Sequence, residues 1–89
     1  MAQSEVLVFP DGTEVAAFFT KGRRLAVHRP LGSKKDYIVT HVPDHAIVLR
    51  TRLKGDGTSA AKALEWLFDR LKPEEIEMVV RRLVSVSEY

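Results

Sequence analysis

The sequence predicts an α+β domain: an antiparallel sheet of four to five strands over residues 5–53, followed by two C-terminal helices packed on one face of the sheet. Residues 5–53 consist of short apolar and β-branched segments separated by Pro, Gly and Asp, as is typical of strands and tight turns. Residues 58–84 carry apolar side chains at spacings of three and four, the period of amphipathic helices. The connections are short, so we expect consecutive strands to pair antiparallel.

Length and composition are those of one small globular unit. The chain has 89 residues, of which 45% are hydrophobic and 29% are charged. No linker rich in Pro, Gly or Ser divides it, so we expect one compact domain over residues 1–89. Fourteen Lys and Arg against twelve Asp and Glu give a net charge of +2, far below that of proteins committed to nucleic acid.

The first two strands are predicted on either side of a turn. The apolar run 6–9 precedes Pro10, Asp11 and Gly12, which respectively preset φ, bond their own backbone and accept a positive φ. Residues 13–20 form the return strand. Its apolar side chains alternate, with Val15, Ala17 and Phe19 on one face and Ala16 and Phe18 on the other. Both faces of this strand are therefore expected to be at least partly covered.

Three more strands are predicted at residues 24–29, 37–42 and 46–53. In the strand 24–29, the inward side chains are Leu25 and Val27, and the outward ones are Arg24, Ala26 and His28. In the strand 46–53, one face carries Ile47, Leu49 and Leu53, and the other carries Val48, Arg50 and Arg52. A small β-barrel followed by a helical hairpin is the alternative architecture, favoured by the two-sided apolar pattern of residues 15–19.

Two helices complete the chain. Residues 54–57 carry two glycines and cannot continue a strand, so Thr58 or Ser59 is expected to cap a helix that runs to about Lys72. Pro73 begins the second helix, and the tail 85–89 is expected to fray or to add to a sheet edge. The predicted apolar stripe of the first helix is Ala60, Leu64, Leu67, Phe68 and Leu71, and Trp66 lies off that stripe.

Several classes of function lack support in the sequence. The chain has no cysteine, so disulfides and thiolate zinc sites are excluded. Its three histidines do not show the spacing of a metal site, and no nucleophile elbow, paired carboxylate or phosphate loop is present. We expect a non-enzymatic protein without cofactor or metal. No apolar run is long enough to span a membrane and the start lacks a basic signal region, so we expect a cytoplasmic location.

Trp66 and Arg70 are the candidate protein-interface residues. They share a helix side apart from the apolar stripe, and an exposed Trp beside an Arg is typical of an interface anchor. The competing interpretation is that Trp66 rests on the second helix or on the chain terminus, because exposed large apolar side chains are costly in a small domain. The first hypothesis is therefore a small protein-interaction module whose partner is another protein. In size and element order the chain is similar to several small phage or mobile-element accessory proteins, including some anti-CRISPR inhibitors. Homo-oligomerisation, through a free strand edge or the helix pair, is a further hypothesis.

The alternative function is nucleic-acid binding on a basic sheet face. Residues 1–53 hold eight Lys and Arg against five acids, and strand arginines opposite the apolar stripe are expected to gather there. The candidate residues are Arg23, Arg24, Arg50 and Arg52, with Lys34 and Lys35 in a loop at the rim. The competing interpretation is that these charges keep an exposed sheet soluble.

Overall fold

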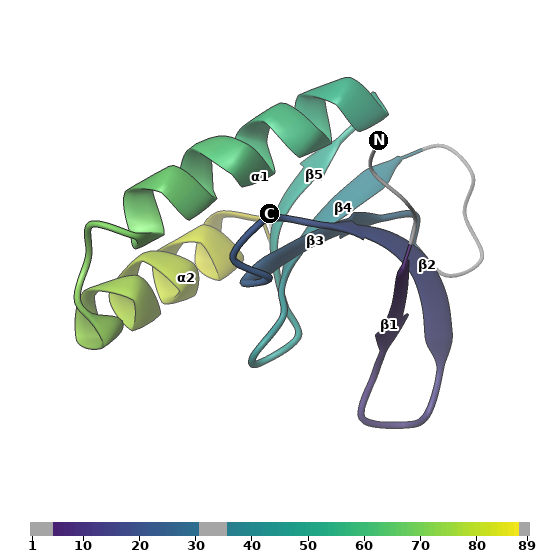
Figure 1. Cartoon of the computed structure of the whole chain (residues 1–89), viewed down its shortest axis with the longest axis horizontal. Helices are drawn as coiled ribbons and strands as arrows, with labels where there is room; N and C mark the ends of the chain where they lie inside the picture. The colour runs from purple at the N-terminus through teal and green to yellow at the C-terminus, as the bar shows by residue number, and fades with distance from the viewer. Residues whose placement is uncertain (1–4, 31–35, 88–89) are drawn as a thin grey trace.

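The computed structural model describes residues 5–30 and 36–87. Its elements, in chain order, are β1 (Glu5–Val8), β2 (Glu14–Phe19), β3 (Leu25–His28), β4 (Tyr37–His41), β5 (Ala46–Thr51), α1 (Lys54–Phe68) and α2 (Pro73–Ser87). The five strands form one antiparallel sheet in the order β1-β2-β3-β4-β5, so every strand pairs with its neighbours in sequence. Both helices lie on the same side of the sheet, and the β1–β2 hairpin bends away from them (Figure 1). The predicted α+β layout is confirmed, and the sheet does not close into a barrel.

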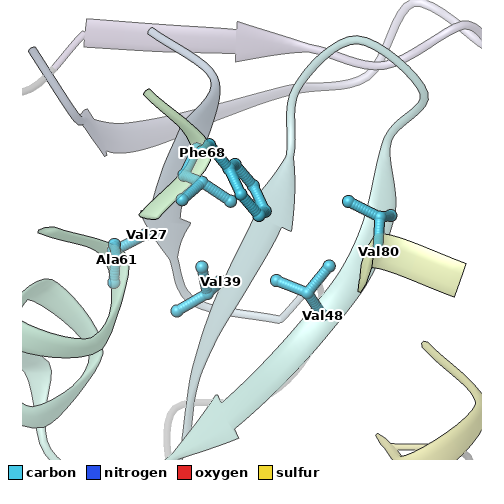
Figure 2. Packing of buried hydrophobic residues seen from close by; sticks show 7 residues of the cluster. Val27, Val39, Val48, Ala61, Phe68 and Val80 are labelled. Atoms are coloured by element: carbon cyan, nitrogen blue, oxygen red, sulfur yellow. The ribbon is translucent and has the colours of Figure 1, made fainter. Parts of the chain in front are cut away.

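The main core lies between the sheet and the two helices. It is built from buried side chains of β3, β4 and β5 below and of α1 and α2 above. Figure 2 shows these side chains and labels Val27, Val39, Val48, Ala61, Phe68 and Val80. Phe68 is the largest side chain that is completely buried. Burying an aromatic ring of this size contributes on the order of 2–3 kcal/mol, and this is the main reason why α1 stays on the sheet.

A second apolar cluster occupies the opposite face, where the hairpin curls. Leu7, Ala17 and Ala26 are buried there, with Phe9 packed against them. The imidazole of His45 in the β4–β5 turn lies 2.9 Å from the carbonyl oxygen of Val8, which holds the end of β1 over this cluster. The expectation that both faces of β2 are at least partly covered is confirmed, because Ala17 is buried on this face and Phe18 packs partly against the main core on the other.

Ala26 and His28 were expected to face outward, but they are not exposed to solvent. The curled hairpin covers their face of the sheet and buries both residues. The His28 ring lies 5.7 Å from the ring of Phe9, and its Nε2 is 2.7 Å from the hydroxyl of Thr40, which is also buried. A sheet treated as flat leaves this face in solvent, whereas a bent sheet covers it with its own first strand.

The predicted facing of Val48 is also wrong. The register of β4 and β5 shifts between Val39 and Thr40, which pair with Leu49 and Ile47 respectively. The extra residue, Val48, forms a bulge, and its side chain enters the helix-side core. Strict alternation along β5 places Val48 with Arg50 instead, because a bulge leaves no mark in a period-two pattern.

The first helix begins at Lys54, four residues before the predicted cap, and β5 ends at Thr51. The residue before the helix is Leu53, which makes no capping hydrogen bond through its side chain. Gly57 explains the early start: a Cβ there would lie 3.0 Å from a methyl carbon of Val27 and 3.1 Å from the hydroxyl of Thr51. The glycine therefore lets the first turn of α1 pack directly on the sheet. At the other end, α2 continues to Ser87, so the predicted change of structure at residue 85 does not occur.

Candidate interaction surfaces

Glu65 is a buried acid in the last turn of α1, and it holds the β2–β3 turn. Its carboxylate accepts hydrogen bonds from the Thr20 hydroxyl at 2.6 Å and from the Arg24 guanidinium at 2.8 Å. Its side chain is 9% exposed. The turn passes so close that a Cβ on Gly22 would lie 2.7 Å from the Glu65 Oε1 atom. This cluster, which we call the Glu65 clamp (Thr20, Gly22, Arg24 and Glu65), joins the helix to the sheet with a satisfied charge.

Arg24 belongs to the Glu65 clamp and is directed toward α1. Besides Glu65, its guanidinium donates a hydrogen bond to the carboxylate of Asp69. The bond to Asp69 and then the bond to Glu65 raise the pKa of Arg24 above its usual value, so the side chain stays charged at any practical pH. Two carboxylates thus match the charge of a residue predicted to face a nucleic acid.

The structure separates the other candidate arginines into two groups. Arg23 lies in the β2–β3 turn with a φ of 59°, pairs with Glu5 and lies 4.4 Å from the centre of the Phe19 ring. Arg50 and Arg52 are exposed near the end of β5, which the register places at the opposite end of the sheet from that turn. The four arginines therefore form no single cluster, and Lys34 and Lys35 lie outside the described residues.

Trp66 is exposed on the outer side of α1, and Arg70 is stacked on it. The Trp66 side chain is 58% exposed. The Arg70 guanidinium lies 3.7 Å from the centre of the indole ring and donates a hydrogen bond of 3.0 Å to the Trp66 carbonyl. Both side chains are therefore held in one arrangement before any partner arrives. The prediction that Trp66 lies off the apolar stripe is confirmed.

A hollow of about 440 Å³ opens between the bend of the sheet and the start of α1. Ala16 and Phe18 of β2 form part of its floor, and Arg29, Tyr37 and Lys54 contribute to its walls. The Arg29 guanidinium donates a hydrogen bond of 2.9 Å to the Tyr37 hydroxyl and lies 4.8 Å from the centre of that ring. The hollow thus combines an apolar floor with basic walls.

Two lysines of α1 add positive charge to this region. Lys54 lines the hollow directly, and the Lys62 amine lies 5.9 Å from the centre of the Phe18 ring. Neither lysine forms an ion pair with any carboxylate within residues 5–30 and 36–87. Their charge is consequently available to a ligand, unlike the charge of Arg24.

The histidines take structural roles. His41 Nδ1 lies 2.9 Å from the Asp44 carboxylate, and the His41 ring packs edge-on against Phe68 at 5.9 Å. Across the described part of the chain, no group of three His, Asp or Glu side chains converges as a metal site would require. Among the same residues, neither helix has the length and apolar character needed to cross a bilayer.

Two of these features were not predicted from the sequence. Glu65 follows Ala61 by four residues and precedes Phe68 by three. This spacing places the acid on the helix face whose residues are buried, and it is the signal that could have identified Glu65. The hollow gives no such signal, because its residues come from three strands and a helix start that are adjacent only once the strand register is known.

No protein-family model matches this chain, and the comparisons with curated proteins and with solved structures found no match. The molecule thus presents two candidate surfaces, the Trp66–Arg70 pair and the hollow.

Proposed function

We propose that this chain is a non-enzymatic protein-interaction module that binds another protein through Trp66 and Arg70. The exposed, prestacked indole of Trp66 is the observation that carries the proposal. Large aromatic and Arg side chains dominate binding energies at protein interfaces, and a side chain already held in place loses little entropy when it binds. Cation–π contact with Arg70 contributes about 0.5–1 kcal/mol at such an exposed site.

The nucleic-acid alternative receives less support. Arg24 is matched by Glu65 and Asp69, and Arg23 is matched by Glu5. Arg50 and Arg52 lie at the other end of the sheet, so the predicted basic face offers no continuous path for a phosphate backbone. Homo-oligomerisation and the cytoplasmic location remain predictions.

The test compares two exposed apolar side chains on different helices. Trp66→Ala removes the proposed anchor, and Met78→Ala on α2, where the side chain is 70% exposed, is the matched control. Each immobilised variant is incubated with a lysate of the organism that makes the protein. We expect the wild type and Met78→Ala to retain the same partner and Trp66→Ala to lose it. Equal retention by Trp66→Ala, or no retention by the wild type, contradicts the proposal.

A further inference from the structure

We infer that the hollow between β2 and the start of α1 is a docking site for an acidic peptide segment of a partner protein, one in which Asp or Glu alternates with apolar residues. This inference rests on the proposed protein-binding function, but it concerns a different set of residues and specifies the chemistry of the partner.

An apolar surface on β1 and β2 adjoins the hollow, as the register of these strands shows. Val6 pairs with Ala16, and Val8 pairs with Glu14, so these residues share the face of β2 that carries Phe18. Val6 and Val8 are 54% and 53% exposed, which is unusual for valines in a strand. They extend the apolar floor of the hollow outward to the edge of the sheet. A partner must therefore bring apolar side chains to cover them.

Positive charge at the hollow comes mainly from α1. Lys54 and Lys62 flank the hollow without a described carboxylate partner, and Arg29 stands in its wall. Glu14 is the acid on the same face of the sheet, and it lies across from Val8, away from α1. Asp36 precedes Tyr37 and Asp56 lies in the first turn of α1, but neither of these acids lines the hollow. The positive potential is thus concentrated where α1 meets the sheet, and a complementary segment carries its acids at that end.

The rings in the hollow favour a peptide over a nucleic acid. The Arg29 guanidinium lies 4.8 Å from the centre of the Tyr37 ring, and the Lys62 amine lies 5.9 Å from the centre of the Phe18 ring, so a cation stands near each ring. Single-stranded nucleic acids bind by stacking bases on open aromatic faces, and the rest of this floor is aliphatic. A valine and alanine floor instead suits the aliphatic side chains of an extended or helical peptide.

The surface also connects to Trp66. Lys62 and Trp66 are four residues apart on α1 and are therefore neighbours along the helix surface. A partner whose acidic segment fills the hollow can continue over Lys62 to the Trp66–Arg70 pair. One partner would then use both sites.

The experiment selects ligands without assuming a partner. A displayed library of random linear peptides is panned on the full-length protein, and a selected peptide is synthesised with a fluorophore for anisotropy titration. Lys54→Glu/Lys62→Glu is the test variant. Lys21→Glu/Lys72→Glu is the control, because it changes the net charge equally at exposed lysines outside the hollow. Circular dichroism verifies that both variants fold.

We expect the selected peptides to be rich in Asp and Glu alternating with apolar residues. We expect the test variant to weaken their binding by about tenfold or more, as charge reversal at a complementary interface does, and the control by much less. Ala16→Glu, which places an acid on the floor, should weaken binding in the same way. Peptides without acids, equal effects of the two double variants, or no enrichment would overturn the inference.

Two further arms separate the alternatives. A fluorescent single-stranded oligothymidine that binds more tightly than the selected peptide, and that loses binding in Lys54→Glu/Lys62→Glu, would overturn the peptide assignment in favour of nucleic acid. Trp66→Ala should still bind the selected peptide, which fills only the hollow. If peptide selection fails while Trp66→Ala loses the captured partner, the hollow inference falls and the proposed function stands.

Discussion

The two ends of β3 carry arginines in opposite settings. Arg24, just before the strand, donates to Glu65 and Asp69 and is part of the structure that holds α1 to the sheet. Arg29, just after the strand, lies over the Tyr37 ring in the wall of an open hollow beside Lys54. The same residue type therefore serves folding at one end and presents a basic wall at the other. What distinguishes them is the part of α1 that lies nearest: Glu65, near the C-terminal end of the helix, bonds Arg24, whereas Lys54, its first residue, lines the hollow beside Arg29.

The largest expected effect is at the centre of the Glu65 clamp. Glu65→Ala removes the acceptor of the Thr20 hydroxyl and of the Arg24 guanidinium in a buried place, and the free energy of unfolding should fall by about 3 kcal/mol. Urea denaturation with linear extrapolation measures this. The control is Glu77→Ala, which breaks an exposed pair with Arg81 and should cost only a few tenths of a kcal/mol. Equal losses in the two variants would show that the clamp is not what holds this end.

The next effect concerns Gly22. Gly22→Ala introduces a Cβ that would lie 2.7 Å from the Glu65 Oε1 atom, and displacing this bonded carboxylate should cost about 1–2 kcal/mol. In a Glu65→Ala background the obstacle is gone, so the same substitution should cost almost nothing. The double-mutant cycle measures this coupling directly. Additive losses would mean that Gly22 is required for another reason.

At the other end of β3, charge reversal should leave stability nearly unchanged. Lys54→Glu/Lys62→Glu alters exposed side chains that form no described ion pair, so the free energy of unfolding should change by no more than about 0.5 kcal/mol. Thermal and urea unfolding of the double variant test the contrast with Glu65→Ala. A loss comparable with that of Glu65→Ala would place these lysines in the folding machinery and remove the difference between the two ends.

The smallest effect lies far from both ends, in the β1–β2 turn. The Thr13 backbone N–H donates to the Asp11 carboxylate at 2.9 Å, and this lowers the pKa of Asp11 below its usual value. A folded-state pKa below the unfolded one stabilises the fold at pH values above the unfolded pKa of about 3.9. That contribution is lost as the pH falls through the folded value. An NMR titration of the Asp11 carboxyl should show the lowered midpoint, and Asp11→Asn should remove this part of the acid dependence of stability.

The fold was predictable from the sequence wherever local chemistry decides it. In the first turn, Asp11 bonds the backbone of Thr13 and Gly12 takes a φ of 89°, as the residue types predict. The hairpins and the two helices follow from such turns and from apolar periodicity. Local chemistry does not predict structure that depends on the close approach of two distant segments. Gly57 begins α1 early because the sheet lies beneath it, and Val48 changes face because of a bulge.

The candidate sites divide in the same way. A helical wheel is sufficient to place Trp66 off the apolar stripe, but it does not decide whether the side chain faces solvent or the second helix. The structure shows that the side chain is 58% exposed. The separation of Arg23 and Arg24 from Arg50 and Arg52 was not predictable, because it depends on which strand ends meet and on which carboxylates α1 brings near. Arg24 sits where Glu65 reaches it. Alternation along a strand gives the face of a residue but not its neighbours across the layers.

The Glu65 clamp also has a consequence for the order of folding. Every strand pairing in this sheet joins neighbours in sequence, so hairpins can form rapidly from local contacts. The bond between Thr20 and Glu65 instead joins residues 45 positions apart, and it requires a formed turn and a formed helix to meet. The clamp is therefore a late event. Glu65→Ala should accelerate unfolding while leaving the refolding rate almost unchanged. The clamp therefore lengthens the lifetime of the native state by slowing its unfolding.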